Sequence, residues 1–320
     1  MNIVFHGKNA ETFRAGIEND LIGDAEISVL SDGLSEPGEA EAYAQADVII
    51  GTRRTATHPA IRAKVYQVAG AGYDGIDLST LPEDTTLCNV FGHEDAIAEY
   101  VMAVLLARHV PFMAADRQLR AGNWFYQAGR GEEGLRGELG AQSIGIVGYG
   151  HIGQTVAKCA LAFGMDVHVA NRSPVTTAGI TAHELSDLGG MMGQVDYVLN
   201  TLPLADGTKG LIGAEALAAM HADAIIMNVG RGAVIDEDAL YDALSNKRIG
   251  GAVIDTWYVY PAADNPAPQP SRHPFNTLDN VIMTPHMSGW THGTIDRRRK
   301  VIAENINRLA AGKELVNRVL

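Results

Sequence analysis

The chain has 320 residues, enough for about two domains that each bury a core of their own. Its net charge of −13 argues against nucleic acid or an anionic membrane surface as a main partner. Two cysteines, Cys88 and Cys159, are too few for a disulfide framework or a metal cluster, so no metal site is expected. The chain opens on a strand-like segment and has no apolar run that would span a bilayer, so we expect a cytoplasmic protein without a membrane partner.

Short apolar segments alternate with helical patterns along the first hundred residues or so. Strands are expected at residues 3–5, 27–30, 48–50, 65–68 and 86–88. A long helix is expected at 95–110, closed by Pro111, and a polar, glycine-rich segment follows at 121–140. The alternation predicts a parallel sheet with helices on both faces.

A glycine motif joins an expected strand at 144–147 to an expected helix at 154–163. It consists of Gly148, Tyr149, Gly150, His151, Ile152 and Gly153, the G-x-G-x-x-G pattern of dinucleotide-binding folds. The first glycine permits a tight turn, the second lets the backbone approach a pyrophosphate, and the third lets the helix pack on the strand. The helix N-terminus would offer N–H groups to the phosphates. Because the motif stands between a strand and a helix, we interpret it as a cofactor site and not as a purely structural turn.

The alternation of strands and helices resumes beyond the motif. Strands are expected at 166–170, 197–200, 224–228, 251–254 and 281–284, with a proline-rich loop at 261–274. The last helix, at 294–311, carries a basic run at 297–300 on a solvated face and is too short to form a domain, so we expect it to return to the first αβ set. The sequence thus predicts an α/β fold with a cleft between two domains. A dinucleotide-binding domain, residues 98–287, is inserted into a discontinuous substrate domain, residues 1–97 plus 288–320.

Three further segments complete a pattern with the glycine motif. They are Asn228-Val229-Gly230-Arg231-Gly232, Asp255-Thr256-Trp257 and Thr284-Pro285-His286-Met287-Ser288-Gly289. In order and spacing, the four segments resemble the D-isomer-specific 2-hydroxyacid dehydrogenase family, over about residues 68–289. The resemblance implies two Rossmann-like domains with doubly wound parallel sheets and a nicotinamide-dependent oxidoreductase acting on a small carboxylate. It also implies a homodimer, which we expect to form through the long helix and residues 121–140.

Two residues of these segments take catalytic roles from the resemblance. Arg231 follows an apolar strand, where its guanidinium suits a planar carboxylate and a carbonyl oxygen; the alternative is a surface arginine beside a turn. His286 ends a strand and matches the acid/base histidine of the family, because carbonyl reduction needs a proton as the hydride arrives. Four other histidines are interpreted as structural, namely His6, His58, His109 and His183.

The third catalytic position departs from the family pattern. The family's carboxylate partner of the histidine lies five residues after the aspartate of the second segment, and counted from Asp255 this position is Tyr260. A carboxylate favours the charged imidazole, whereas a phenol gives only a hydrogen bond. We therefore expect His286 to titrate at lower pH than beside a glutamate, unless Asp264 or another acid reaches it. Carbonyl reduction would then fall off at lower pH as well.

Small residues at 68–74 match the substrate loop of the family. Backbone N–H groups of Ala71, Gly72 and Tyr73 would point at a carboxylate, and the alternative is an ordinary glycine turn. Asn89 matches a pocket asparagine of formate dehydrogenases in the same superfamily. Three aromatic side chains either crowd the cleft or belong to the core, namely Trp257, Tyr260 and Trp290.

The end of the second strand of the nucleotide domain decides between the two nicotinamide cofactors. Members that prefer NAD place an aspartate there, which accepts from both ribose hydroxyls. Here the strand leads into Asn171, Arg172 and Ser173, with no carboxylate to repel a 2′-phosphate and two side chains able to bind one; the alternative is a turn cap. We expect NADP(H) to be preferred, without excluding NAD(H). The resemblance places further residues beside the cofactor, namely Thr201, Leu202, Pro203, Val229, Gly230, Asp255, Ser288 and Gly289.

The leading hypothesis is an NADP(H)-dependent oxidoreductase that interconverts a small 2-keto acid and a D-2-hydroxy acid. Formate oxidation with NAD(P)+ stays open, because it requires no proton transfer and tolerates a weakened acid/base pair. Phosphite oxidation is disfavoured, since that branch has a lysine in the substrate loop where this chain has Ala71. A dinucleotide-sensing corepressor is a further alternative, against which the acidic charge and the retained Arg231 and His286 argue.

Overall fold

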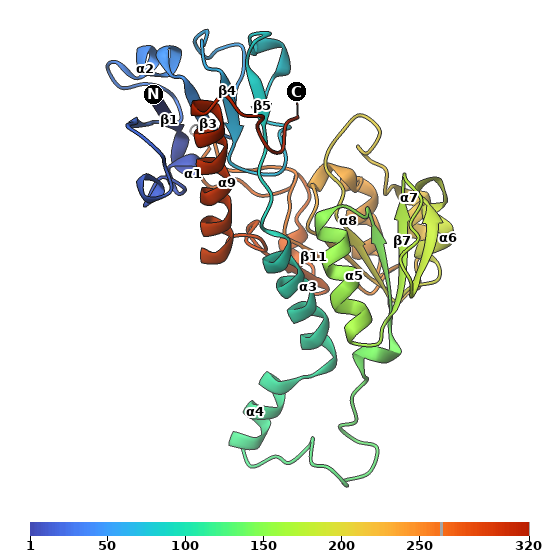
Figure 1. Cartoon of the computed structure of the whole chain (residues 1–320). Coiled ribbons are helices and arrows are strands. Elements are labelled where there is room, and N and C mark those ends of the chain that lie inside the picture. Colours follow the sequence, from blue (N-terminus) through green and yellow to red (C-terminus); the bar gives the residue numbers. More distant parts are fainter. Residues whose placement is uncertain (263–264, 320) are drawn as a thin grey trace. The chain divides into compact units, whose positions relative to one another are not determined.

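The computed structural model of the chain describes residues 1–262 and 265–319, so Asp264 lies outside the described residues. The chain divides into two compact units (Figure 1). The first comprises Met1–His93 and Trp290–Leu320, and the second comprises Glu94–Gly289. The boundaries expected from the sequence, after residue 97 and before residue 288, lie close to these limits.

The first unit is built on a five-stranded parallel sheet in the order β2-β1-β3-β4-β5. Its strands are β1 (Asn2–His6), β2 (Glu26–Leu30), β3 (Val48–Gly51), β4 (Val65–Val68) and β5 (Thr86–Cys88). Its helices are α1 (Gly7–Glu11), α2 (Glu39–Gln45) and α9 (His292–Ala310). Ile302 and Ile306 of α9 pack on one face of the sheet with Ile3 and Phe5, so the last helix returns to the first unit as expected.

The second unit contains a seven-stranded parallel sheet in the order β12-β11-β10-β9-β6-β7-β8. Its strands are β6 (Ser143–Val147), β7 (Asp166–Asn171), β8 (Ile180–Glu184), β9 (Tyr197–Asn200), β10 (Ile225–Asn228), β11 (Gly251–Ile254) and β12 (Val281–Met283). Its helices are α3 (Glu94–His109), α4 (Phe112–Arg120), α5 (His151–Ala162), α6 (Leu188–Met192), α7 (Ala214–Ala219) and α8 (Glu237–Ser245). Short 3₁₀ turns lie at Ile17–Asn19, Leu78–Thr80, Leu139–Ala141, Leu185–Asp187, Gly232–Val234 and Phe275–Thr277.

Helices cover both faces of the second sheet. Buried residues of α3 and α5 pack on one face, and those of α6, α7 and α8 pack on the other. The strand order reverses between β6 and β9, with β7 and β8 on one side and β10 to β12 on the other. The predicted doubly wound α/β fold is confirmed, and this reversal is where such sheets bind ligands.

Three elements of the second unit differ from the sequence expectation. Strand β8 was not predicted, because its sequence ITAHE is polar and partly exposed, as befits an edge strand that pairs only with β7. Helix α4 was not predicted either, since Pro111 was expected to end helical structure; it ends α3 but also starts α4 as its N-cap residue. Helix α5 begins at His151, earlier than expected, because the last three motif residues form its first turn.

The basic run of α9 was expected on a solvated face, and for Arg298 this was wrong. Its side chain is buried and donates to the carbonyl oxygens of Ala69 (3.5 Å) and Phe91 (3.4 Å). Helical spacing explains the difference, because Arg298 follows Ile295 by three residues and precedes Ile302 by four, which places it on the same face as this apolar stripe.

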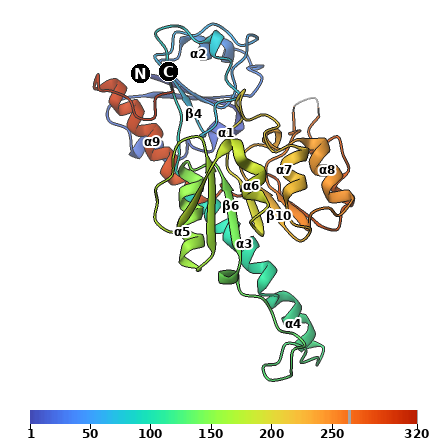
Figure 2. The ribbon, with the colours of Figure 1, turned by 90° about the vertical axis from the view of Figure 1, so that its right-hand side faces the viewer.

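Helix α4 extends away from the sheet of its own unit in both views (Figures 1 and 2). No single helix in the described part of the chain is long and apolar enough to cross a membrane, although α3 and α4 together, bent by 47°, pass a test of length and composition. Helix α4 and the segment that follows it expose several large apolar side chains, namely Phe112, Met113, Leu119, Trp124 and Leu135.

Candidate active site

The site residues that the sequence predicts in the second unit lie at the carboxyl ends of its strands. One group follows each of six strands: Gly148 after β6, Asn171 at the end of β7, Thr201 after β9, Arg231 after β10, Asp255 after β11 and His286 after β12. In an open parallel sheet the carboxyl ends of all strands share one edge, and ligands bind outside that edge. The fold therefore brings these residues, which span more than a third of the chain, to one edge of one sheet.

The three motif glycines meet different surroundings. Gly148 has a φ of +97°, and a Cβ there would lie 2.8 Å from Leu202 Cδ2. A Cβ on Gly153 would lie 2.2 Å from the carbonyl oxygen of Gly148, so helix and strand pack too closely for any side chain. A Cβ on Gly150 would meet nothing within 4 Å. Two of the glycines thus serve the fold, while the middle one leaves open space against the backbone.

The start of α5 completes a cradle for phosphate groups. No side chain caps this N-terminus, at Gly150. The first N–H groups of a helix have no partner within the helix, and the helix dipole favours an anion beside them. The open space at Gly150 and the donors of the first turn of α5 fit the pyrophosphate of a dinucleotide.

Asn171 has a structural role at the end of β7. Its Oδ1 accepts the N–H of Tyr149 at 3.1 Å, and its Nδ2 donates to the carbonyl oxygen of Ser173 at 2.9 Å. It therefore joins the glycine loop to the turn after β7, which agrees with the turn-capping alternative for this residue. Arg172 and Ser173 are exposed, and Arg172 makes no hydrogen bond or ion pair with any residue that the structure describes. Its guanidinium can therefore take an anionic ligand without giving up a partner in the described chain.

The backbone of Arg231 is fixed by the glycines on either side. A Cβ on Gly230 would lie 2.5 Å from the carbonyl oxygen of Leu202, and one on Gly232 would lie 2.2 Å from that of Trp257. The loop after β10 thus packs directly on the backbone of the loops after β9 and β11. The Arg231 side chain is half-buried, and its Nη1 donates to the Gly230 carbonyl oxygen at 3.1 Å.

Two buried asparagines, which the sequence did not single out, support this loop. Asn228 Oδ1 accepts from Asn200 Nδ2 (2.9 Å) and from the N–H of Gly230 (3.2 Å), while its Nδ2 donates to the Arg231 carbonyl oxygen (3.2 Å). Both asparagines end buried strands, where a polar side chain needs a partner. A polar residue closing an apolar strand is the signal that would have identified them.

His286 stands on a loop that Asp255 holds. His286 has a φ of +58°, a conformation uncommon for a residue with a side chain. The Asp255 carboxylate is fully buried and accepts from the hydroxyl of Thr284 (2.6 Å) and from the N–H groups of Met287 (2.9 Å) and Ser288 (3.0 Å). These charge-assisted hydrogen bonds hold the backbone on both sides of His286 in its left-handed conformation.

Two aromatic side chains support the same loop through Thr284. Trp257 Nε1 donates to the Thr284 carbonyl oxygen at 2.8 Å, and the hydroxyls of Tyr100 and Thr284 lie 2.8 Å apart. Burial raises the pKa of Tyr100, so this hydroxyl remains protonated. Tyr100 lies on α3, far from the motifs in sequence, and no pattern in the sequence marked it.

Tyr260 contacts the imidazole of His286, as its position in the sequence predicts. The Tyr260 hydroxyl lies 2.9 Å from Nδ1 of His286, and it accepts the N–H of Trp257 at 3.0 Å. With one lone pair used by Trp257, the hydroxyl can still donate to a neutral imidazole or accept from the Nδ1–H of an imidazolium. The phenol therefore orients the ring in either protonation state.

Other predicted site residues lie in the first unit. Ala71 and Gly72 are half-buried after β4, and Tyr73 is exposed. Asn89 is buried, and its Nδ2 donates to the Ala71 carbonyl oxygen at 2.8 Å, so it supports the loop. Trp290 packs edge to face on Phe13 with ring centroids 6.1 Å apart.

The remaining predicted residues of the second unit surround the same sheet edge. Thr201 donates to the carbonyl oxygens of Val147 (3.0 Å) and Gly148 (3.1 Å). Trp257 is buried and packs on Phe275, which assigns it to the core. Of the other members, Val229, Gly230 and Ser288 are buried, Leu202 and Gly289 are half-buried, and Pro203 is exposed.

This chain matches a known protein family. The model of the NAD-binding domain of D-isomer specific 2-hydroxyacid dehydrogenases matches residues 101–288. The chain is 33% identical over 305 residues to a D-3-phosphoglycerate dehydrogenase from Methanocaldococcus jannaschii, a match that covers 91% of this chain but 54% of that protein. The chain thus spans about half the length of this relative. It is 31% identical over 299 residues to a hydroxypyruvate reductase from Thermotoga maritima, covering 90% of this chain and 92% of that protein.

Solved structures resemble the chain over its whole length. An acyclic imino acid reductase in complex with NADPH and D-Arg has a TM-score of 0.78 and 27% identity, with 100% of both chains covered. A D-isomer specific 2-hydroxyacid dehydrogenase family protein from Aeromonas salmonicida has a TM-score of 0.82 at 24% identity, covering 100% of this chain and 98% of that one, which shows a shared fold.

Proposed function

The chain belongs to the D-isomer specific 2-hydroxyacid dehydrogenase family, and from this premise we propose that it reduces a small 2-keto acid to a D-2-hydroxy acid with NADP(H). The observation that carries the proposal is the sheet edge itself. A phosphate cradle, an arginine on a fixed loop and a histidine oriented by a hydroxyl all lie at the carboxyl ends of one parallel sheet.

In the proposed reaction Arg231 holds the substrate. Its planar guanidinium pairs with the carboxylate and polarises the adjacent carbonyl oxygen. In its cationic form His286 gives a proton to that oxygen, and in the reverse direction the neutral ring takes it back. In the first unit, taken by itself, we propose that the N–H groups of Ala71, Gly72 and Tyr73 can bind a carboxylate, in a loop that Asn89 supports through its hydrogen bond to Ala71. The proposed substrate is a small molecule that carries a carboxylate.

The proposed cofactor site begins at the glycine loop. Residues 148–153 hold the pyrophosphate of the dinucleotide, which supplies or accepts the hydride when bound. Arg172 and Ser173 bind the 2′-phosphate, which makes NADP(H) the preferred cofactor while NAD(H) is still accepted. Asn171 contributes by fixing the turn between them. The residues that would hold the nicotinamide half are Thr201, Leu202, Pro203, Val229, Gly230, Asp255, Ser288 and Gly289.

We further propose a homodimer in which α3, α4 and residues 121–140 form the contact. The exposed apolar side chains of this region support it, with Phe112 58%, Trp124 57% and Leu135 76% exposed. Large exposed apolar side chains that recur along one segment are typical of interaction sites. Sedimentation equilibrium of the wild-type chain and of a Phe112→Glu, Trp124→Glu variant tests this, since only the wild type should dimerise.

A second candidate is reduction of a 2-imino acid to a D-amino acid. A protonated imine already carries the proton on nitrogen that a carbonyl oxygen must receive, so hydride addition alone completes the reduction. A phenol in place of a carboxylate beside His286 suits a reaction that asks less of the acid. The similarity to an imino acid reductase over the full length of both chains supports the same candidate.

One assay separates these candidates. NADPH oxidation is followed with glyoxylate, hydroxypyruvate and pyruvate, each with and without ammonium or methylamine, and NADP+ reduction is followed with formate. Turnover of a keto acid alone supports the proposed reaction, and turnover only with the amine supports imine reduction. NADP+ reduction by formate would support formate oxidation, and tight cofactor binding without any turnover would support a sensing role.

A further inference from the structure

The loop that carries Tyr260 is closed at its base by its own backbone. The carbonyl oxygen of Pro270 accepts the N–H groups of both Tyr258 (3.2 Å) and Val259 (3.0 Å). Tyr260 is the next residue along the chain. Two hydrogen bonds and one peptide unit therefore link Pro270 to Tyr260, so a shift of Pro270 would also move Tyr260.

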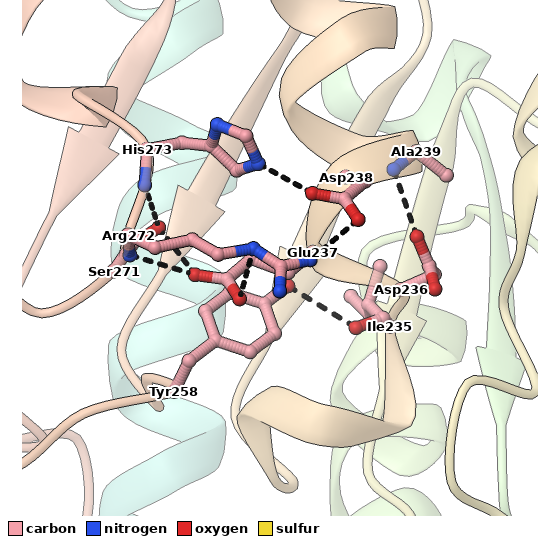
Figure 3. A network of polar contacts seen from close by, with 9 residues as sticks. All are labelled: Ile235, Asp236, Glu237, Asp238, Ala239, Tyr258, Ser271, Arg272 and His273. Atoms are coloured by element: carbon pink, nitrogen blue, oxygen red, sulfur yellow. Dashed lines mark hydrogen bonds and ion pairs between the residues drawn. The ribbon is translucent and has the colours of Figure 1, made fainter.

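Glu237, in the first turn of α8, holds the far side of this base (Figure 3). Its Oε1 accepts from the hydroxyl of Ser271 (2.6 Å) and from the N–H of Arg272 (2.9 Å), and its Oε2 lies 3.3 Å from Arg272 Nε. The Glu237 side chain is only 14% exposed. A largely shielded carboxylate with three donors around it fixes the backbone of the residues that directly follow Pro270.

The near side of the base is attached to the same part of the fold. Tyr258 donates its hydroxyl to the carbonyl oxygen of Ile235, in the turn that leads into α8 (Figure 3). Burial raises the pKa of Tyr258, so this donor keeps its proton. Asp236 caps α8 by accepting the N–H of Ala239 at 2.9 Å, which stabilises the N-terminal end of this helix. The residues at both ends of the loop, Tyr258 on one side and Ser271 and Arg272 on the other, thus bond to residues at the N-terminal end of α8.

We infer that Glu237 is a positioning residue for the acid/base histidine, acting through Tyr260. Glu237 accepts hydrogen bonds from Ser271 and Arg272, the two residues that follow Pro270. The Pro270 carbonyl oxygen in turn holds the backbone of residues 258–259, which places the Tyr260 hydroxyl beside Nδ1 of His286. The inference rests on the proposed function for its catalytic meaning. The positioning itself is a property of the free protein.

The neighbouring carboxylate provides a matched control. Asp238 contacts the side chains of the same Arg272 and of His273, but it is 63% exposed and accepts no backbone N–H of the loop in the described chain. Ion pairs this exposed contribute little, because water and salt screen them. Loss of Asp238 should therefore leave Tyr260 in place, whereas loss of Glu237 should not.

The test is a double-mutant cycle between Glu237 and Tyr260 in the full chain. Glu237→Ala and Tyr260→Phe should each lower kcat/KM for keto acid reduction by roughly tenfold, because small misplacements of reacting groups are costly. The double variant should be no worse than the poorer single variant, since both changes break one pathway. Asp238→Ala should stay within about twofold of wild type. Glu237→Gln keeps an oxygen that accepts from Ser271 and Arg272, so it should restore most of the activity.

A substrate-free readout accompanies the kinetics. The His286 ring is titrated by imidazole NMR, with its signal identified by its absence in His286→Gln. Glu237→Ala and Tyr260→Phe should both move the His286 titration to lower pH, because Tyr260→Phe removes the acceptor of the imidazolium Nδ1–H and Glu237→Ala displaces it. Asp238→Ala should not move it. If no substrate is turned over, the proposed function fails while this titration still decides the inference.

Two results would overturn the inference. One is a Glu237→Ala effect that persists at full size in the Tyr260→Phe background, since Glu237 would then act by another route. The other is a folded Glu237→Ala variant in which His286 titrates as in wild type while Tyr260→Phe shifts it. Either would reduce Glu237 to a residue that only stabilises α8 and its loop.

Discussion

The hydroxyl of Tyr260, five residues after Asp255, lies 2.9 Å from Nδ1 of His286. A carboxylate would hold the imidazole in its charged form, whereas a phenol can bond to either form. The hydrogen bond orients the ring in either protonation state.

Replacing Tyr260 with glutamate should extend keto acid reduction to higher pH. The reduction needs the imidazolium, and a carboxylate at this distance keeps the ring protonated to higher pH by roughly one unit or more. Tyr260→Phe should move the fall in the opposite direction. The measurement is the pH dependence of kcat/KM for reduction, and an unchanged profile for Tyr260→Glu would contradict the account.

Two neighbouring glycines should respond differently to alanine. Apart from its chain neighbours, a methyl group at Gly150 meets no atom of the described chain within 4 Å, so Gly150→Ala should keep its thermal stability but bind NADPH at least roughly tenfold more weakly, because the methyl fills the phosphate space. At Gly153 the methyl would lie 2.2 Å from a carbonyl oxygen, so Gly153→Ala should lose about 1–3 kcal/mol of stability. Thermal unfolding and NADPH fluorescence titration measure the two effects. If Gly150→Ala bound NADPH with wild-type affinity, the pyrophosphate could not bind at this loop.

Arg172→Ala should reduce the preference for NADPH over NADH. A charge-assisted contact to the 2′-phosphate is worth about 1.5–3 kcal/mol, so the ratio of the two kcat/KM values should fall by roughly tenfold or more. Lys158→Ala removes another exposed cation of the same unit and should leave the ratio alone. The assignment of the 2′-phosphate site fails if Arg172→Ala keeps the wild-type ratio.

Buried His6 should make stability fall in mild acid. Burial lowers the pKa of His6, with a smaller effect from the neighbouring His58, and its Nδ1 has no hydrogen-bond partner among the described residues. A depressed pKa means that the unfolded chain takes up the proton first, so the stability is present above about pH 6.5 and is lost as pH falls. Urea unfolding between about pH 7 and about pH 5 should show a smaller loss in His6→Leu than in wild type. The exposed His221→Leu serves as control, and an equal loss in all three proteins would refute the role of His6.

Most of the fold follows from local patterns in the sequence, and the exceptions have local causes. Apolar runs identified the buried strands because parallel strands are covered on both faces, whereas β8 is a polar edge strand and was missed. Arg298 was misassigned because four basic residues in a row suggest a surface, although helical spacing turns one of them inward. The start of α5 was placed too late because it lies within the glycine motif, and α4 was missed because Pro111 was expected to end helical structure.

The candidate site was predictable where its residues follow strand ends. Arg231 and His286 could be identified from motifs, and Tyr260 from its spacing after Asp255. Contacts between side chains distant in sequence were not predictable, because no periodicity links Tyr100 to Thr284 or Glu237 to Ser271. The structure also gave Asn171 a bond to the glycine loop that its position alone did not suggest.

Keto acid turnover in wild type and in Arg231→Gln tests the proposed reaction directly. Each protein is assayed for NADPH oxidation with glyoxylate, hydroxypyruvate and pyruvate, and NADPH affinity is measured alongside. Wild type should turn over at least one of these acids, and Arg231→Gln should lose roughly 100-fold or more in kcat/KM while still binding NADPH, because the bidentate cation is gone. Tight NADPH binding by wild type with no turnover of any keto acid would contradict the central claim.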